Sequence, residues 1–277
     1  MAFLSAGGAV RSSEAARPDR PVSPPPRAKD ASGGRALSDR LARGPLDAAA
    51  QVQREELFGG NLPSFLRRWV PVDFSRERDG SVLGYVLPDY LAIGDDRDFA
   101  YARLAAFDAQ RIATRWKCHL PTPFMVDAIF RAAQFRFAAN GLVGRSQVDW
   151  RRQAQKYDAR LMRQRRQHVP EPENLVAGHL KDIVATPARR RKPYRVAIYG
   201  MHQRSGRATQ PLSLYHRLDY VDYSHGVRLV SDRLRVDGKE RSLRRCLERR
   251  DCLSHLSAGV ALPLPSYPSR CPQALCG

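Results

Sequence analysis

Histidines gathered in one part of the chain are the residues whose chemistry is most useful near neutral pH. Four of the seven histidines fall between residues 179 and 225. An imidazole can accept a proton, donate one or hold a metal ion in this pH range. The four are His179, His202, His216 and His225. We expect a functional site in this part of the chain.

Carboxylates and turn-forming residues accompany these histidines. The aspartates among them are Asp182, Asp219 and Asp222. Segments 178–182, 199–202 and 222–226 each combine a histidine with a glycine. Glycine beside a histidine allows a backbone or a substrate to approach closely. The pattern is typical of side chains presented from turns.

A metal-dependent hydrolase is one arrangement that these residues could form. Two or three imidazoles and one carboxylate would hold a divalent ion such as zinc and leave one position for water. The pKa of that water falls to about 7 on the metal, which gives a nucleophile at neutral pH. The candidate metal ligands are His179, His202, His216 and His225, and the identity of the metal stays open.

Two arrangements without a metal are also open. In one, Ser224 is the nucleophile and a histidine from another strand is its base, since the neighbouring His225 would point to the opposite face of a strand. In the other, Cys118 attacks after activation by one of the later histidines. The chain contains neither His-Glu-x-x-His nor Gly-x-Ser-x-Gly, so no spacing decides among the three.

Apart from Cys118, the three arrangements draw on one set of candidate catalytic residues. These are His179, Asp182, His202, His216, Asp222, Ser224 and His225. For any single histidine, a structural hydrogen-bonding role is the competing interpretation. No glycine-rich loop follows a predicted strand, so the sequence indicates no cofactor-binding residues.

Positive charge is the second feature that bears on function. Lys+Arg total 47 against Asp+Glu 28, a formal net charge of +19, and residues 151–250 carry a net +15 of it. A basic surface attracts phosphate and other polyanions. Because only six of the basic residues are lysine, a compositional bias toward arginine is the alternative explanation. No nucleic-acid-binding motif accompanies the charge.

Composition excludes several classes of protein. Hydrophobic residues make up 43% of the 277 residues, which argues against disorder throughout. No apolar run approaches the ~20 residues that cross a membrane. The five cysteines form no Cys-x-x-Cys pair, which disfavours a four-cysteine zinc site and a dense disulfide framework. A Cys271–Cys276 bridge and several unrelated thiols both remain compatible with this count.

Helical patterns dominate the first half of the chain and strand patterns the last third. Expected helices cover 53–57, 63–70, 107–117, 122–140, 151–166 and 242–248. Expected strands cover 81–87, 174–186, 194–200 and 226–236, the last followed by a hairpin turn at 236–239.

These elements predict an α+β fold with a helical N-terminal half packed on a β-rich C-terminal half. Residues 1–50 are rich in Ala, Arg, Pro, Ser and Gly and predict a disordered N-terminal tail. Residues 51–252 are expected to form a single α+β domain. Residues 253–277 are expected to form an irregular C-terminal tail.

Several motifs resemble those of a family of largely uncharacterised bacterial proteins. They are Phe-Leu-Arg-Arg at 65–68, Val-Pro-Val at 70–72, Pro-Asp-Tyr-Leu-Ala-Ile-Gly at 88–94, Ala-Gln-Arg-Ile-Ala at 109–113, Leu-Pro-Thr at 120–122, Met-Val-Asp at 125–127, Gly-His at 178–179 with Lys-Asp at 181–182, Ile-Tyr-Gly at 198–200 with His202, Gln-Pro-Leu at 210–212, and 220–229. The resemblance covers about residues 60–250 and implies one domain, with no established activity. Family members look exported, which implies the cell envelope or the extracellular space.

The chain departs from this family in three places. Met201 stands where the family has tryptophan, and neither residues 144–170 nor the tail after Cys252 match well. The first residues also lack the basic segment of a secretory signal, which leaves the location open.

A second likeness concerns residues 224–229, Ser-His-Gly-Val-Arg-Leu. This segment resembles the signature of L,D-transpeptidases, which join or cleave cell-wall peptides. In that family a cysteine nucleophile follows Ser-His-Gly, whereas Val227 occupies its place here. The likeness therefore does not imply the transpeptidase reaction.

Two functions follow as hypotheses. The first is a hydrolase-like domain that acts on a peptide or glycan of the bacterial cell envelope. The alternative is a non-catalytic module that binds an anionic polymer, either nucleic acid or a cell-wall polymer. The sequence decides neither whether the protein is an enzyme nor what its substrate, metal or oligomeric state is.

Overall fold

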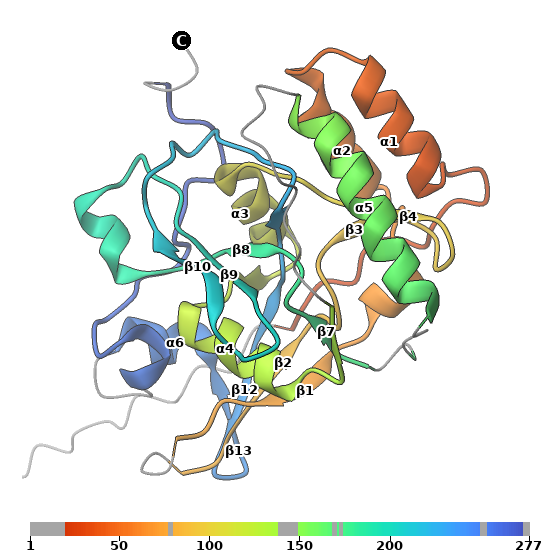
Figure 1. Ribbon diagram of the computed structural model, residues 1–277. Coiled ribbons are helices and arrows are strands. Elements are labelled where there is room, and N and C mark those ends of the chain that lie inside the picture. The colour runs from red at the N-terminus through yellow and green to blue at the C-terminus, as the bar shows by residue number, and fades with distance from the viewer. Residues whose placement is uncertain are drawn as a thin grey trace, which may run out of the picture.

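Two β-sheets form the centre of the molecule (Figure 1). The structure is a computed structural model that describes residues 20–76, 80–137, 149–167, 171, 174–249 and 254–273. The description below concerns these residues.

The larger sheet is antiparallel and has five strands. Its order is β1 (Val70–Asp73), β2 (Val82–Val86), β12 (Val230–Val236) and β13 (Lys239–Ser242), and β5 (Cys118–His119) also pairs with β12. Along β2 the side chains alternate between buried and half-buried, as expected for a strand with one covered face. Strands β12 and β13 form the expected hairpin, in which Asp237 has a φ of 47° and Gly238 a φ of 76°.

The smaller sheet carries most of the candidate site residues. Its order is β10 (Ala208–Ser213), β9 (Ile198–His202), β8 (Lys181–Ile183) and β11 (His225–Gly226). The β8–β11 pair is parallel, and it places His225 opposite Lys181 and Gly226 opposite Asp182. Two further strand pairs are β3 (Ala92–Gly94) with β4 (Phe99–Tyr101), and β6 (Phe135–Arg136) with β7 (Val176–Ala177).

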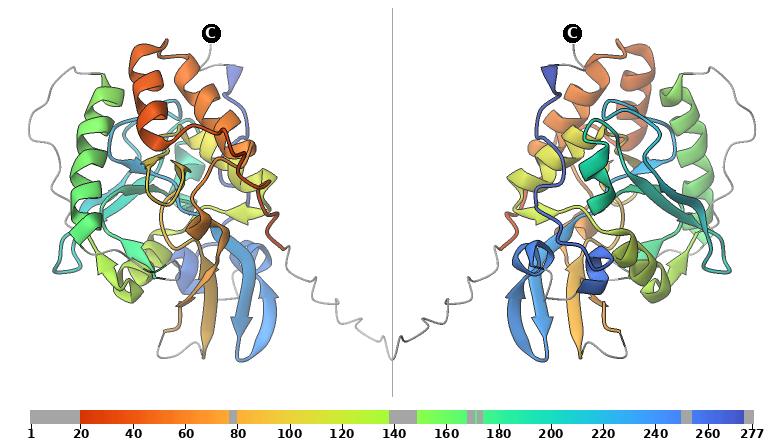
Figure 2. Two further views of the ribbon diagram at one scale, coloured as in Figure 1. Left: turned by 90° about the vertical axis from the view of Figure 1, so that its right-hand side faces the viewer. Right: turned by 90° about the vertical axis from the view of Figure 1, so that its left-hand side faces the viewer.

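Helices cover the sheets and connect them. They are α1 (Gly34–Arg43), α2 (Ala48–Phe58), α3 (Ala106–Arg115), α4 (Pro123–Ala132), α5 (Trp150–Gln167) and α6 (Leu243–Glu248), with the 3₁₀ turns η1 (Ser64–Arg67), η2 (Pro187–Arg191) and η3 (Ser254–Ser257). Helix α4 contacts β1 of one sheet and β9 of the other, so it joins the two. Figure 2 shows α1 and α2 at one end and the β12–β13 hairpin at the opposite end.

The mixed α+β class is confirmed, but the expected division into a helical half and a β half is not what the structure shows. Strands β1–β6 all come before residue 137, and helices α5 and α6 come after it. The long-range pairing of β2 with β12 builds one sheet from both halves of the chain. Such pairing leaves no local pattern in the sequence.

Residues 20–50, which composition assigns to a disordered tail, contain ordered elements. Helix α1 packs against α5 and β4, and Leu37 is only 1% exposed. Asn61 accepts a hydrogen bond from Arg27 and donates one to the carbonyl of Ser32, which fixes the segment before α1. Residues 1–19 lie outside the described residues.

Helix α4 begins where the sequence predicts and ends earlier. The Thr122 hydroxyl accepts a hydrogen bond from the amide of Met125, and Pro123 takes the first helical position. The helix ends at Ala132, because Phe135 and Arg136 form β6 with β7. The predicted end at 140–141 lies outside the described residues.

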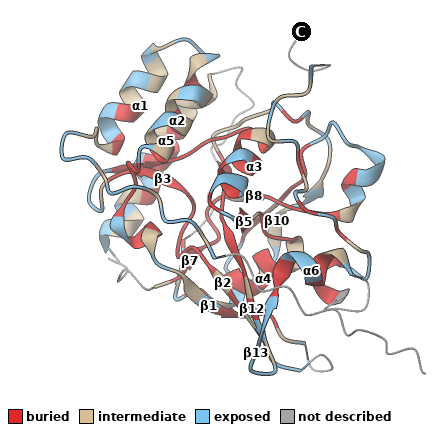
Figure 3. Ribbon diagram, turned by 180° about the vertical axis from the view of Figure 1, so that it is seen from behind, coloured by how far each residue is buried: buried red, intermediate tan, exposed pale blue. Residues whose placement is uncertain are grey.

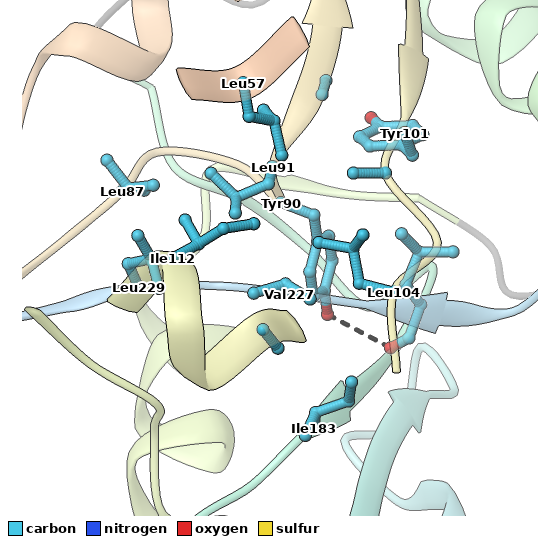
Figure 4. Packing of buried hydrophobic residues seen from close by; sticks show 14 of the residues in the cluster. Leu57, Leu87, Tyr90, Leu91, Tyr101, Leu104, Ile112, Ile183, Val227 and Leu229 are labelled. Carbon is cyan, nitrogen blue, oxygen red and sulfur yellow. Dashed lines mark hydrogen bonds between the residues drawn. The ribbon is translucent and has the colours of Figure 1, made fainter. Parts of the chain in front are cut away.

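Buried residues, whose ribbon is red in Figure 3, form two large hydrophobic clusters between the sheets and the helices. The largest cluster contains residues of the N-terminal elements from α1 to β4. It also contains Leu180, which immediately precedes β8, and Val227, which immediately follows β11. Figure 4 shows Tyr90 and Val227 within this packing. The C-terminal segment belongs to the core as well, because Tyr267 is 2% exposed and its hydroxyl donates to the carbonyl of Val184.

Candidate functional site

Strand β8 divides the candidate residues into two groups. Consecutive side chains of a strand point to opposite faces. Lys181 therefore lies on one face, where its Nζ is 3.4 Å from Asp222 Oδ2. Asp182 lies on the other face, where its Oδ2 accepts a hydrogen bond of 2.8 Å from the Tyr90 hydroxyl.

His202 shares the face of Asp182. Its Nε2 is 2.8 Å from Asp127 Oδ1, and that same oxygen accepts a 2.8 Å hydrogen bond from the Tyr199 hydroxyl. The imidazole stacks on the ring of Phe130, with 4.5 Å between the ring centroids. His202 is therefore oriented by a carboxylate on one edge and by an aromatic ring on one face.

Gly200 keeps Asp182 and His202 close together. A Cβ on Gly200 would lie 3.4 Å from Asp182 Oδ2 and 3.6 Å from His202 Cε1, so both groups border the same small space. The φ of Gly200 is 107°, a conformation that residues with a side chain rarely adopt. In the sequence Tyr-Gly-Met-His, the glycine therefore allows the close approach of Asp182 and His202, and the histidine supplies the imidazole.

The buried position of Asp182 disfavours the ionised form of its carboxyl group. Asp182 is 1% exposed, and its Oδ1 has no hydrogen-bond partner among the described residues. Burial raises the pKa of Asp182 to about 6, against the opposing effect of the positive charge of Arg228. Burial and the nearby Asp182 likewise raise the pKa of the Tyr90 phenol. Asp182 can therefore exchange a proton near neutral pH.

The space around these groups is narrow. Tyr90, Phe130, Gly178, Asp182, His202 and Arg228 are among the residues that line it. It leaves no room for the centre of a water molecule, so reactants reach Asp182 only when its lining moves. Asp127 is more accessible, because its side chain is 36% exposed and borders a neighbouring cleft of about 830 Å³.

His179 lies in a separate buried cluster. Its Nε2 is 3.4 Å from Asp89 Oδ1, and neither ring nitrogen makes a hydrogen bond with a described residue. Burial lowers the pKa of His179. Burial also acts to raise the pKa of Asp89, but His179, Arg165 and Arg228 outweigh it and lower that pKa to about 2. His179 can interact with Asp89 but is completely shielded from solvent.

Asp222 organises the opposite face of β8. Its Oδ1 accepts hydrogen bonds of 2.6 Å from both the amide and the hydroxyl of Ser224. Its Oδ2 lies 3.4 Å from the Tyr220 hydroxyl. Burial acts to raise the pKa of Asp222, but His225, the positive charge of Lys181 and the Ser224 hydrogen bonds outweigh it and keep that pKa below its usual range. Ser224 is fully buried and donates to a carboxylate rather than to a histidine.

His216 and His225 both lie against Tyr220. The His216 ring stacks on Tyr220 at 3.6 Å, and His225 meets the same ring edge-on at 5.5 Å. Burial lowers the pKa of His225 to about 4, although Asp222 acts to raise it. Burial also lowers the pKa of His216. Both imidazoles are therefore neutral at pH 7.

A large open groove runs past His216 and Tyr220. It has a volume of about 1270 Å³, and we call it the basic groove. The residues of its lining that matter below are Arg191, Lys192, Tyr194, Arg195, Tyr215 and His216. Tyr215 is 76% and Tyr194 52% exposed, and none of the three cations forms an ion pair with a described residue.

The four histidines do not meet around one cavity. His202 lies on one face of β8, His216 and His225 on the other, and His179 in the Asp89 cluster. Among the described residues, no group of three or more His, Cys, Asp or Glu side chains is placed to hold a metal ion. The structure thus brings together two pairs, Asp182 with His202 and His216 with His225.

The cysteines occupy two different chemical states. Cys118 is a free thiol whose pKa is raised by burial, and its Sγ faces the carbonyl of Trp116. A buried neutral thiol is a poor nucleophile. Cys246 and Cys271 each take part in a disulfide, so these two cysteines are not free thiols.

Residue patterns alone missed four members of the site. These residues orient the histidines and Asp182 or affect their pKa values, and they are Asp89, Tyr90, Asp127 and Arg228. Each lies within a motif of the family resemblance, in Pro-Asp-Tyr, Met-Val-Asp or the 220–229 segment. Attention to histidine alone overlooked carboxylates that lie far away in the sequence.

Val227 and Arg228 have structural positions within the transpeptidase-like segment. Val227 is fully buried in the main hydrophobic cluster, as Figure 4 shows. The Arg228 guanidinium donates to the carbonyls of Leu87 and Val176 and lies 4.4 Å from the centroid of Tyr90. The position of the transpeptidase nucleophile is thus a core position here.

Comparisons with protein-family models, with curated proteins and with solved structures give no match. Within the described residues, no helix has the length and apolar character needed to cross a membrane.

Proposed function

We propose that the protein binds an anionic polymer along the basic groove. The observation that carries this proposal is the grouping of Arg191, Lys192 and Arg195 with the exposed rings of Tyr194 and Tyr215 in one groove. Small-molecule sites usually measure ~300–1000 Å³. A basic groove of about 1270 Å³ fits an extended chain better than a small ligand.

The electrostatics of the groove support a polyanion. Arg191, Lys192 and Arg195 are exposed and have no acidic partner among the described residues, so they retain charge that a ligand can neutralise. Each cation that neutralises a charge on a polyanion releases a counterion, and binding then weakens as salt rises. Arg191, Lys192 and Arg195 belong to residues 151–250, the part of the chain with a net charge of +15.

Salt-dependent binding to heparin and to polyphosphate tests the proposal. We expect affinity to fall linearly on a log–log plot against salt. The double variant Arg191→Gln/Lys192→Gln should reduce the slope by about 2, because each lost contact removes about one unit. The matched control is Lys239→Gln/Arg241→Gln, which removes two exposed cations from the β12–β13 hairpin. Equal effects of the two double variants would refute a localised site.

A second candidate function is hydrolysis at Asp182 and His202, and a specific observation favours it. Asp182 combines a buried, unpartnered oxygen with a pKa of about 6, beside a histidine held by Asp127. Proton transfer is most efficient when the catalytic pKa lies near the working pH. Strongly perturbed groups of this kind are concentrated at functional sites.

The proposed hydrolytic step assigns one role to each group. Water forms a bond to the electrophilic carbon of an envelope peptide or glycan, and its proton passes to His202, whose charge Asp127 balances. The bond to the leaving group breaks, and the leaving atom takes the proton of Asp182. Phe130 and the other residues of the narrow cavity must move to admit the substrate.

Digestion of purified bacterial cell wall tests this second function. We expect Asp182→Asn and His202→Gln each to lower any release of soluble fragments at least 100-fold, since one proton transfer is worth ~10²–10⁴ in rate. Lys239→Gln, on the exposed β12–β13 hairpin, is the control and should retain full activity. Activity that survives both Asp182→Asn and His202→Gln would refute this assignment.

A further inference from the structure

We infer that the polymer taken by the basic groove is a polysaccharide that carries carboxylate groups. This inference rests on the proposed polyanion binding and names the class of polymer. It concerns the groove alone and is independent of the chemistry proposed at Asp182.

Aromatic rings in the groove favour a ligand that contains rings. Tyr215 lies two residues after the end of β10 and is 76% exposed, and Tyr194 is 52% exposed. Arg195 Nη1 donates a 2.7 Å hydrogen bond to the backbone carbonyl of Tyr215, which holds this guanidinium next to the Tyr215 main chain. The electron-rich face of an aromatic ring attracts the C–H groups of a sugar ring, as it does other positive edges. A charged ring such as a uronic acid could contact both side chains at once.

The acidic residues of the groove argue against a densely charged ligand. Asp47 and Asp219 also line it, and both are exposed; Asp219 forms an ion pair of 3.1 Å with Arg217, which lines the groove as well. A nucleic acid or polyphosphate places a charge on every unit, so some of its charges would lie beside these carboxylates and its binding would be weaker than that of a polymer with spaced charges. Sugar hydroxyls instead can donate hydrogen bonds to carboxylate oxygens, which accept several. The mixture of acids and cations therefore fits a ligand rich in hydroxyl groups with interspersed negative charge.

Arginine is the main cation available to this ligand. Arg191 and Arg195 present planar guanidinium groups that can bind a carboxylate through two parallel hydrogen bonds. Phosphate suits the same group, so arginine alone does not separate the two ligands. The acidic side chains and the exposed tyrosines make that distinction.

The disulfides point to the same class of partner. Cys271 lines the groove, and Cys271 and Cys246 are disulfide-bonded. Structural disulfides persist in oxidising environments such as the cell exterior. Polysaccharides are the abundant polyanions of that environment, whereas nucleic acids are concentrated in the reducing interior.

Binding to four oligomers of equal length distinguishes the contributions of the sugar ring, the negative charge and the class of polymer. We would measure binding by isothermal calorimetry at 0.15 M salt to a decameric oligogalacturonate, a neutral cello-oligosaccharide, decameric polyglutamate and single-stranded dT₁₀. The expected result is binding to oligogalacturonate at least tenfold tighter than to polyglutamate or dT₁₀, and none to the neutral sugar.

Variants of Tyr215 test the contribution of the ring. Tyr215→Ala should weaken oligogalacturonate binding about tenfold, while Tyr215→Phe should stay within twofold of the natural protein because it keeps the ring. The side chain is exposed, so both variants should fold. An equal loss in Tyr215→Phe, or none in Tyr215→Ala, would contradict ring stacking and overturn the inference.

The outcomes also distinguish this inference from the proposed function. If dT₁₀ or polyglutamate binds as tightly as oligogalacturonate, the acidic polysaccharide is wrong and polyanion binding stands. If the neutral sugar binds equally well, charge is irrelevant and both fall. If none of the four binds and heparin and polyphosphate also fail, the groove is not a polyanion site.

Discussion

Two buried ionisable groups on opposite faces of β8 should make opposing contributions to stability as the pH changes. Asp182 has a pKa of about 6, above the ~3.9 of an unfolded chain, so the folded state binds its proton more tightly. Its contribution to the free energy of unfolding is full below pH ~4 and is lost as pH rises through 6. His225 has a pKa of about 4, below the ~6.5 of an unfolded chain. Its contribution is full above pH ~6.5 and is lost as pH falls toward 4.

Replacing Asp182 should therefore stabilise the protein above pH 6. In Asp182→Asn an amide oxygen can still accept the Tyr90 hydrogen bond, and no charge has to be buried. A shift of about two pKa units corresponds to about 3 kcal/mol at most. Urea denaturation at pH 4 and pH 7 would measure it. A gain at pH 7 without a gain at pH 4 is expected, and a loss at both would show that the folded protein does not resist ionisation of Asp182.

Replacing His225 should have the opposite pH signature. His225→Gln removes a buried group that becomes harder to keep neutral in acid, so the variant should gain stability at pH 4 relative to pH 7. The difference is again about 3 kcal/mol at most. The same denaturation series checks this value, with His216→Gln as a more exposed comparison. If His225→Gln shows the pH profile of the natural protein, His225 is not strongly perturbed by burial.

At the scale of the element, β9 depends on a glycine that serves two purposes. Gly200 has a positive φ, and an added Cβ would press against Val126 Cγ1 at 3.2 Å and Asp182 Oδ2 at 3.4 Å. Gly206 also has a positive φ, but a Cβ there would meet nothing within 4 Å. The two positions therefore separate backbone strain from crowding.

Gly200→Ala should destabilise the protein more than Gly206→Ala. Backbone strain alone costs about 1–2 kcal/mol at either position. Crowding at Gly200 should add about 1 kcal/mol or more and shift the titration of Asp182. Chemical denaturation gives the first quantity, and proton NMR of the His202 ring against pH gives the second. Equal losses in the two variants would mean that β9 shifts to accommodate the methyl group.

The elements also show why the sequence predicted part of the fold and missed the rest. The start of α4, helix α5 and the β12–β13 hairpin were predicted because capping residues, helical spacing and turn residues act locally. The pairing of β2 with β12 joins residues about 150 apart, and no local pattern encodes it. The same limit applies to the site, because Asp127 lies on α4 and its partner His202 lies on β9.

At the scale of the whole molecule, the N-terminal helix is part of the core. The many small and polar residues before residue 50 led to the prediction of a disordered tail. That prediction did not take account of the apolar face of α1. Leu37 fills a position that is 1% exposed, in contact with the largest cluster. Few apolar residues are enough to order a segment when they are inserted between elements that are already packed.

Leu37→Ala should therefore destabilise the protein globally. A buried leucine replaced by alanine usually costs ~2–5 kcal/mol, because the cavity closes only partly. The neighbouring Arg35→Ala removes an exposed side chain and should cost less than about 0.5 kcal/mol. Thermal denaturation of the two variants makes the comparison. Equal, small effects would show that α1 is not coupled to the rest of the fold.

Consecutive side chains of β8 point into two different environments. Substitutions at neighbouring positions of this strand should therefore have two different kinds of effect. A systematic mutational scan should link Lys181 to the charge of its partner Asp222 and Asp182 to proton exchange with its own surroundings, although the two residues are adjacent in sequence. An insertion of one residue in this strand would exchange the two side chains between faces and damage both properties together. Selection on either property thus constrains the other through a strand of three residues, Lys181–Ile183.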